Sequence, residues 1–463
     1  MTDHESNWDT LVEVSPAETR IAVVDGDGML RRFRIERQNA KSPVHALYRA
    51  KVTKIEKATG GAFFDLGDPV LGDVFLPKIP KAMTEGQSAL VQVIRPPDGN
   101  KGAAITTRPV LKGRYCTYYP TGGSGTVDRR CGQGKRRAEL EQALGNLMPK
   151  TGGLMINCAA MAAPEKAIAD EVNDLCSEWR AISNAYEKAD RPGILQPAPD
   201  ALQLTLLEAP PEGRIAIDDR RVHAASKSAV DARWPDLKDG LLFHDPRIPI
   251  YNAAGLESEI DGLAERISPV PGGGSLSIDR VEAMTVIDVN LADTKIAPDG
   301  YSGTVKLNLR AAEEAARQIE LRNLSGLIVI DFVSMRNKED RKKVVDATRK
   351  ALRNATVPTD VLGITAAGLV EITRQRNGPS LADQLLAPAL AAVAHPSAEA
   401  AAILRKLTHS LGAGRPVVSA SEKVISVIKS DFADALRETE LRIGQAIVFE
   451  ERTALGWEAA LQR

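Results

Sequence analysis

Apolar and polar residues alternate over much of the first hundred positions of the chain. Residues 10–36 read LVEVS, RIAVVDG and LRRFRIE around a DGDG turn, which is typical of a β-hairpin or meander. Residues 47–108 continue with short β-type runs (YRAKVTKIEK, GAFFDLG, DVFLP, ALVQVIR and AAITT) between intervals rich in Gly, Pro and Asp. Several short strands at this spacing predict a small barrel.

After the barrel, apolar residues recur at helical spacing, and from 203 onward helical and strand patterns alternate. The helical spacing predicts a helix over about 136–148 and a second helix over 170–189 that has an apolar face. PGILQPAPDA, at 192–201, is typical of a linker. Strand and helix patterns alternate from 203 to 390, which predicts an α/β domain, and 398–463 predicts a last, small α/β segment.

Two predicted strands of the α/β region carry polar residues at their ends. In GLIVIDFVSM an apolar run leads directly into Asp331, and in AMTVIDVNLAD Asp288 and Asn290 lie on the face opposite the apolar residues. Ligands bind at the carboxyl ends of strands in open α/β sheets. If the strands are neighbours, the carboxylates converge and suit Mg²⁺. The alternative is that each Asp caps a turn or pairs with an arginine such as Arg374.

Aromatic and basic residues in and after the barrel offer a second kind of site. Phe63 and Phe75 flank a turn, where exposed rings would stack on unpaired bases and buried rings would belong to the core. Lys101 lies on a turn and is by itself an ordinary solvated lysine. TVDRRCGQGKRR, which contains Arg129 and Arg130, is either a solvated loop or an arm that contacts RNA.

Composition narrows the class of protein. The 463 residues are 43% hydrophobic and 26% charged with a formal net charge of -1, which predicts a soluble protein of several domains and no strongly basic surface overall. No apolar run reaches the ~18 residues of a membrane helix, and the polar N-terminus is not a secretory signal. The four scattered cysteines lack a CxxC motif and predict free thiols in a reducing cytoplasm. PGGGS, at 271–275, lacks the GK[ST] of a phosphate loop and predicts a flexible turn between domains.

Taken in order, these segments resemble the ribonuclease E/G family of bacterial endoribonucleases over residues 9–385. The most specific motifs are GGSLSIDRVEAMTVIDVN, LNLRAAEEAARQIELRNLSGLIVIDFVSM and GLVEITRQRNGPSL. The earlier YRAKVTKIEKATGGAFFDLGDPVLGDVFLP and NKGAAITT look like the family's S1-type OB domain. The resemblance implies a multidomain α+β and α/β fold with these parts: an RNase H-like subdomain over 1–42 and 203–270, the S1-type RNA-binding domain over 43–112, a sensor-like region over 113–202, a DNase I-like catalytic subdomain over 271–390 and a small C-terminal α/β domain over 398–463.

The resemblance also implies roles for individual residues. By motif match, Asp288 and Asp331 hold one Mg²⁺ and Asn290 is the asparagine of the catalytic site. The ion would activate a water and stabilise charge on the phosphoryl oxygens during cleavage. The residues implied to contact RNA are Phe63, Phe75 and Lys101, to which the basic stretch adds Arg129 and Arg130.

The sequence departs from the family pattern at several points. Asn157 and Cys158 follow GLMI where the family's 5′ sensor has Arg-Thr, so no fork-shaped cation grips a 5′-monophosphate there. SLADQLLAPALAAVAHP has no CPxC, so we expect no structural zinc, and any homo-oligomer would form without a zinc link. Ser334 replaces an acidic residue that often supports the metal site, and we expect no scaffold tail for degradosome partners.

The leading hypothesis is a Mg²⁺-dependent endoribonuclease that cuts single-stranded RNA in the cytoplasm during RNA processing or decay, including maturation of ribosomal RNA. The alternative is a non-catalytic RNA-binding or regulatory protein with the same fold. The joint presence of Asp288, Asn290 and Asp331 favours the enzyme, because a protein that only binds RNA has no use for that group.

Overall fold

The chain forms a mixed α and β structure that divides into two compact units. The computed structural model describes residues 9–80, 82–97, 102–211, 213–245, 247–281, 283–291, 301–353, 355–387, 390–409, 414–452 and 456–462. The first unit consists of Met1–Met29 and Arg34–Ile250, and the second of Leu30–Phe33 and Tyr251–Arg463. None of the helices in the described ranges is both long and apolar enough to cross a membrane.

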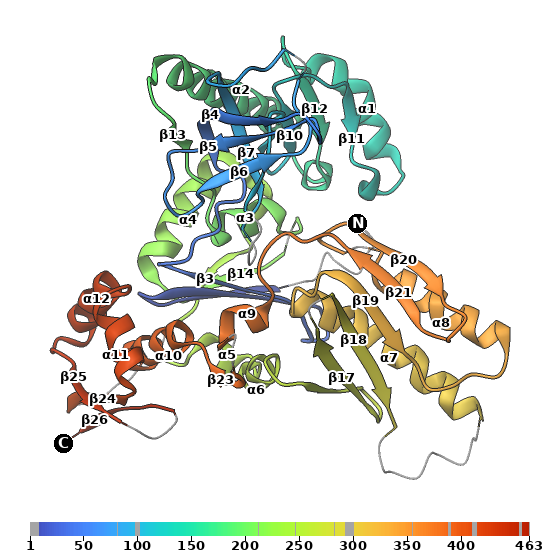
Figure 1. Ribbon diagram of the computed structural model, residues 1–463, viewed down its shortest axis with the longest axis vertical. Coiled ribbons are helices and arrows are strands. Elements are labelled where there is room, and N and C mark those ends of the chain that lie inside the picture. Colours follow the sequence, from blue (N-terminus) through green and yellow to red (C-terminus); the bar gives the residue numbers. More distant parts are fainter. Residues whose placement is uncertain are drawn as a thin grey trace. The chain divides into compact units, whose positions relative to one another are not determined.

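A closed barrel forms part of the first unit (Figure 1). Its five strands, all within the described residues, are β4 (Leu47–Glu56), β5 (Gly61–Asp65), β6 (Asp73–Leu76), β7 (Ser88–Arg95) and β8 (Ala104–Thr106). Their order is β4-β5-β6-β8-β7, and β7 pairs back with β4 to close the barrel. Only β6 and β8 run parallel among these pairings, as in an OB-type fold. The predicted small barrel is therefore confirmed.

The segment that the sequence predicted to be a linker contributes a strand to the same sheet. Gly193–Gln196 forms β13, which pairs antiparallel with β4. The prediction was wrong here because the strand is short and half-exposed, and its register shifts between Ile194 and Gln196. A segment of this kind has too few residues to show the alternation that identifies a strand.

A second sheet of the first unit joins distant parts of the chain. It has the order β15-β14-β1-β2-β3. Strands β1 and β2 are antiparallel, whereas β14 is parallel to β1, and β15 is parallel to β14. The elements are β1 (Asp9–Val14), β2 (Glu18–Val24), β3 (Leu30–Arg37), α3 (Ala201–Glu208), β14 (Ile215–Ile217), α4 (Arg220–Arg233), η3 (Pro235–Leu237) and β15 (Leu241–Phe243).

The sensor-like region is built around a buried carboxylate. Glu171 is only 8% exposed and accepts hydrogen bonds from the backbone N–H groups of Arg114, Tyr115 and Cys116 and from the indole of Trp234. These bonds fix helix α2 against the start of β10. The two predicted helices are confirmed as α1 and α2, although α2 begins earlier than expected. The elements are β9 (Leu111–Lys112), β10 (Cys116–Tyr119), β11 (Gly125–Val127), η1 (Arg129–Cys131), α1 (Lys135–Leu147), β12 (Gly153–Ile156), η2 (Cys158–Met161) and α2 (Glu165–Lys188).

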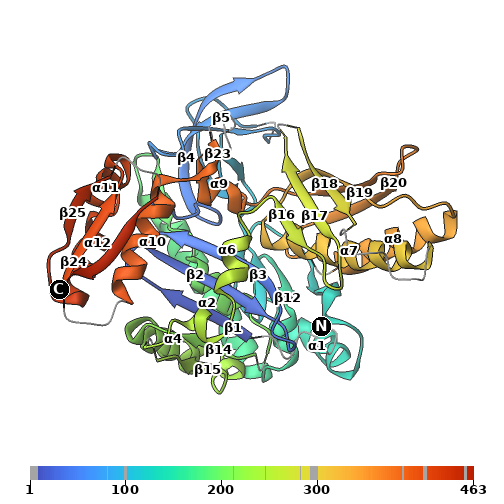
Figure 2. The same ribbon diagram turned by 90° about the horizontal axis from the view of Figure 1, so that it is seen from below.

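The second unit contains a mixed sheet with helices on one face (Figures 1 and 2). The strand order is β16-β17-β18-β19-β21-β20, and β18 and β19 are its parallel pair. Helix α7 lies close to the sheet because small residues, including Ala311 and Ala315, are fully buried on its inner face. The elements are α5 (Ile250–Ala253), α6 (Glu257–Gly262), β16 (Ile267–Pro269), β17 (Ser275–Arg280), β18 (Met284–Asn290), α7 (Tyr301–Leu321), β19 (Gly326–Asp331), α8 (Lys338–Ala351), β20 (Thr359–Ile364) and β21 (Val370–Arg374).

The last part of the second unit is the small α/β segment that the sequence predicted. Strand β24 lies between β25, to which it is parallel, and β26, to which it is antiparallel. The elements are α9 (Leu381–Leu385), β22 (Leu386–Ala387), β23 (Leu390–Ala394), α10 (Pro396–Thr408), β24 (Arg415–Ala420), α11 (Glu422–Lys429), α12 (Ala433–Ile443), β25 (Val448–Glu451) and β26 (Glu458–Gln462).

Candidate functional site

The register of two parallel strands brings the predicted acidic residues together. Asp288 on β18 is the direct neighbour of Asp331 on β19, so adjacent strands about 4.8 Å apart carry two carboxylates side by side. Both residues are exposed. Ile287 and Val289 point to the other face of β18, where they are buried against the helices. The structure thus confirms that the two strands are neighbours and that the carboxylates converge.

Strand β17 adds a hydroxyl and orients an amide on the same face. Ser277 is opposite Asp288 in the antiparallel register, and Asn290 donates its Nδ2–H to Ser277 Oγ at 3.1 Å. Because the amide nitrogen is held in this way, the carbonyl Oδ1 of Asn290 is left for another partner. We call Ser277, Asp288, Asn290 and Asp331 the carboxylate face.

The alternative in which an aspartate pairs with Arg374 is wrong, because Arg374 has other partners. Arg374 is 3% exposed and donates to Glu320 Oε1, Asn323 Oδ1 and the Leu324 carbonyl. Among the described residues, neither Asp288 nor Asp331 has a hydrogen-bond or ion-pair partner. Two adjacent like charges without a counterion repel each other, and a cation between them would remove that repulsion.

Asn308 of helix α7 fixes the backbone that follows Asp331. This side chain is fully buried, and it donates to the Val333 carbonyl at 2.7 Å and accepts from the Val333 N–H at 3.2 Å. Two hydrogen bonds to one residue set the direction of the chain as it leaves β19. Asn308 was not among the residues predicted from the sequence, although a polar residue on the apolar face of a predicted helix is a signal that could have identified it.

The glycine turn before β17 packs against the same site. Gly272, Gly273 and Gly274 have φ angles of 81°, 111° and 89°, which favour glycine. A Cβ on Gly274 would lie 2.8 Å from the Asn290 carbonyl oxygen and 2.9 Å from Leu307. The turn connects β16 and β17, which pair as a hairpin. The prediction of a flexible turn between domains was therefore wrong, because the sequence does not reveal that the glycines pack closely.

Phe63 and Phe75 form an aromatic pair on the outside of the barrel. They are direct cross-strand partners on β5 and β6, with ring centroids 5.0 Å apart and an interplanar angle of 48°. Both are half-buried, whereas the neighbouring Phe64 and Val74 fill the barrel core. The rings therefore lie outside the core and can reach a ligand. Lys101 lies outside the described residues.

One of the two arginines predicted to contact RNA already pairs with a neighbouring aspartate. Arg129 and Arg130 are both exposed on η1. Arg130 donates to both carboxylate oxygens of Asp128, at 3.0 and 2.7 Å for Oδ2. That side chain of Asp128 also caps η1 through the Arg130 N–H. Arg129 is thus the more available of the two for a phosphate.

The two residues at the sensor position have local structural partners. Asn157 donates to the carbonyls of Gly113 and Arg114 at 3.0 and 3.3 Å, and accepts from Thr117 Oγ1 at 3.0 Å. Its amide is therefore fully engaged in holding the turn between β9 and β10. Cys158 is a free thiol, and a hydrogen bond from Cys131 lowers the pKa of Cys158.

Comparison with known proteins agrees with this geometry. The sequence profile described as "Ribonuclease E/G family" matches residues 110–377, which include the sensor-like region and the carboxylate face. The chain belongs to the ribonuclease E/G family. Within the family it is similar over nearly its whole length to ribonuclease G of Escherichia coli K12, at 29% identity over 473 aligned positions covering 94% of this chain and 95% of that protein.

Two further relatives extend the comparison within the ribonuclease E/G family. Ribonuclease G of Haemophilus influenzae is 30% identical, with 80% of each chain covered. Ribonuclease E of E. coli K12 is 31% identical over 79% of this chain but only 36% of its own length. The similarity to ribonuclease E is therefore confined to a part of that longer protein.

Proposed function

We propose that this protein is a Mg²⁺-dependent endoribonuclease that cleaves single-stranded RNA. The observation that carries the proposal is the pairing of Asp288 with Asp331 on adjacent parallel strands. Family membership supports it, since the family profile covers residues 110–377, which contain both aspartates, and the similar proteins are named ribonuclease G and ribonuclease E. The donors of the carboxylate face are all oxygens, which suits a hard cation such as Mg²⁺ and not a thiolate-preferring metal.

Each residue of the carboxylate face has a separate role in the proposed reaction. Asp288 and Asp331 would hold the ion, and Asn290 would present its Oδ1 beside them because Ser277 holds its Nδ2. When bound, Mg²⁺ supplies an activated water and stabilises charge on the phosphoryl oxygens. Asn308 keeps the chain after Asp331 in place, so the second carboxylate stays aligned with the first.

The barrel would hold the RNA strand. The half-buried pair Phe63 and Phe75 offers two ring surfaces for unpaired bases, and the family resemblance implies Lys101 as a further contact to RNA. Arg129 and Arg130 would add positive charge from the sensor-like region. Stacking needs unpaired bases, so the proposed substrate is single-stranded RNA, cut in the cytoplasm during processing or decay.

Cleavage of an unstructured A/U-rich oligoribonucleotide with Mg²⁺ or with EDTA tests the proposal. We expect internal cuts with Mg²⁺, none with EDTA, and recovery of cleavage when excess Mg²⁺ is restored. The oligodeoxyribonucleotide of the same sequence is the matched control and should remain intact. Binding of the RNA without cleavage in Mg²⁺ would reject the enzyme and favour the alternative, a non-catalytic RNA-binding protein of the same fold.

A further inference from the structure

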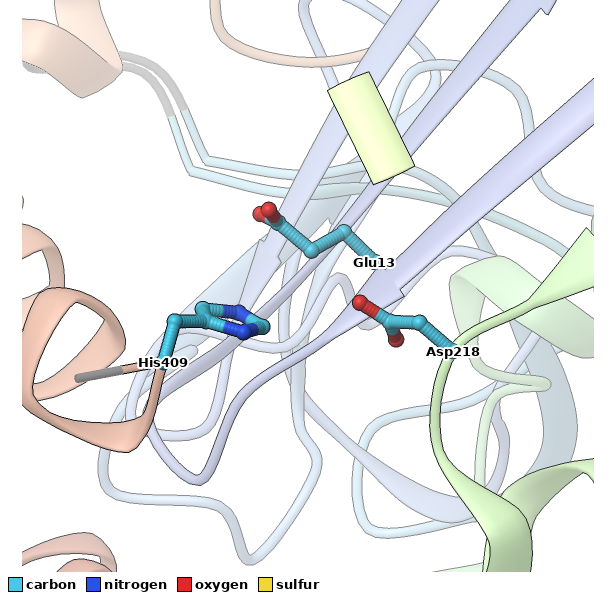
Figure 3. Close-up of side chains that lie close together, drawn as sticks. All are labelled: Glu13, Asp218 and His409. Carbon is cyan, nitrogen blue, oxygen red and sulfur yellow. The ribbon is translucent and has the colours of Figure 1, made fainter. Parts of the chain in front are cut away.

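A second pair of carboxylates is buried in the first unit (Figure 3). Glu13 lies on β1, and Asp218 directly follows β14, which is parallel to β1 with Val12 beside Ile217. The next positions in this register are Glu13 and Asp218, and their carboxylate oxygens lie within 4.8 Å of each other. His409, which is also drawn in Figure 3, belongs to the second unit. The site considered below is formed by the first unit alone.

An arginine pairs with one of these carboxylates. Arg20 Nε donates to Glu13 Oε2 at 2.6 Å, and both side chains are almost fully buried. Asp218 has no arginine or lysine of its own among the described ion pairs, and Asp219 adds a further negative charge next to it. Asp218 is therefore a buried carboxylate without a counterion among the described ion pairs, and such a group is costly.

Asp218 also has an oxygen without a partner. Its Oδ1 accepts the Val14 N–H at 2.8 Å, but its Oδ2 has no hydrogen-bond partner among the described residues, although the residue is only 4% exposed. Burial, followed by the negative charges of Glu13 and Asp219, raises the pKa of Asp218 to about 7. An orphaned, buried carboxylate oxygen facing a second carboxylate is an arrangement that a bound cation would explain.

We propose that Glu13 and Asp218 bind a hard divalent cation, of the Mg²⁺ or Mn²⁺ class, as a structural ion of the first unit. Asp218 Oδ2 and one oxygen of Glu13 would be the protein ligands, and water would complete the shell, since Mg²⁺ commonly uses only one or two carboxylates. The ion would join β1 to the end of β14. This site shares no residue with the carboxylate face, so it can be tested independently of the proposed function.

Mn²⁺ binding to the full-length chain tests the proposal. The variant Asp288→Asn/Asp331→Asn removes the proposed catalytic ligands, and equilibrium dialysis with electron paramagnetic resonance counts the Mn²⁺ that remains. We expect about one Mn²⁺ per chain, and we expect its loss when Asp218→Asn is added. Mn²⁺ should also raise the melting temperature of the Asp288→Asn/Asp331→Asn variant, but not that of the variant that also carries Asp218→Asn.

Asp219→Asn is the matched control, because it removes one negative charge at the neighbouring position. Asp219 caps helix α4 by accepting from the N–H groups of Arg221 and Val222, and asparagine can serve as an N-cap in the same way. Asp219→Asn should therefore keep its Mn²⁺. The proposal is overturned if the Asp288→Asn/Asp331→Asn variant binds no Mn²⁺, if Asp218→Asn leaves binding unchanged, or if Asp219→Asn abolishes it equally.

Discussion

At the scale of single residues, one hydrogen bond fixes the orientation of the Asn290 amide. Ser277 Oγ accepts the Nδ2–H of Asn290, so Oδ1 is the atom presented to the proposed ion. Without the hydroxyl, the amide could rotate and place a donor where an acceptor is needed. Ser277 is a positioning residue in this account, because it acts through Asn290 and not on the substrate.

Ser277→Ala should lower kcat about fivefold to tenfold and raise the Mg²⁺ concentration needed for half-maximal cleavage, with KM for RNA nearly unchanged. A neutral hydrogen bond contributes about 1 kcal/mol, which corresponds to this factor. Ser277→Thr keeps the hydroxyl and should restore much of the rate. Ser275→Ala, on the same face of β17, is the matched control. If Ser275→Ala and Ser277→Ala reduce kcat equally, the hydrogen bond to Asn290 is not responsible.

Asn157 leads to an expectation about the 5′ end of the RNA. A terminal monophosphate is gripped best by an arginine fork, whose charge-assisted hydrogen bonds contribute about 1.5–3 kcal/mol, or roughly tenfold to hundredfold in rate. Asn157 is neutral, and its amide is already bonded to Gly113, Arg114 and Thr117. Oligoribonucleotides with 5′-monophosphate and 5′-hydroxyl should therefore be cut at rates within about threefold of each other. A tenfold preference for the monophosphate would show that other residues sense it.

At the scale of elements, the hairpin turn between β16 and β17 supports the carboxylate face through close packing. Gly273 and Gly274 both have positive φ angles, but only a Cβ on Gly274 would meet a neighbour, the Asn290 carbonyl oxygen at 2.8 Å. Gly274→Ala should therefore displace the end of β18 and reduce cleavage by about tenfold or more. Gly273→Ala also places alanine at a positive φ angle, of 111°, but without the clash. Equal cleavage by the two variants would contradict this explanation.

The barrel strands β5 and β6 carry the proposed base-stacking surface. Phe63→Ala and Phe75→Ala should each weaken binding of single-stranded RNA by about 1–3 kcal/mol, and the affinity of the unaltered protein should fall steeply with salt. Val70→Ala is the control, because Val70 is 85% exposed in the loop between the same strands. Melting temperatures separate the alternatives: a lower melting temperature with unchanged affinity of the folded protein would mean that the rings only stabilise the barrel.

Most helices and strands could be predicted from the local pattern of apolar and polar residues. The remaining features depend on strand pairing and on contacts between elements. The apolar run before Asp331 and the alternation around Asp288 were sufficient to predict two strands whose carboxylates converge if the strands are neighbours, and the structure shows that they are. The strand β13 was missed because four half-exposed residues carry almost no periodic signal. Ser277, Gly274 and Asn308 were missed for another reason. Their contributions come from register and contacts across elements, which a single sequence does not contain.

At the scale of the whole molecule, each of the two units contains a pair of carboxylates on, or directly after, neighbouring parallel strands. Asp288 and Asp331 are exposed in the second unit, whereas Glu13 and Asp218 are buried in the first. An exposed pair can exchange an ion with solvent and reach a substrate, whereas a buried pair can only hold an ion in place. This contrast is why we assign a catalytic role to the first pair and a structural role to the second. Neither role calls for zinc, which fits the absence of a CPxC motif from the sequence.

The central claim is that Asp288 and Asp331 together carry the cleavage chemistry. The most direct measurement is the rate of Mg²⁺-dependent cleavage of one unstructured oligoribonucleotide by Asp288→Asn and Asp331→Asn, with melting temperatures measured alongside. Each change removes a negative ligand at nearly constant volume, so we predict loss of at least about a hundredfold in rate with the fold intact. Asp279→Asn, on the same face of β17, should retain most of the activity. Rates within about threefold of the unaltered protein in both aspartate variants would contradict the account.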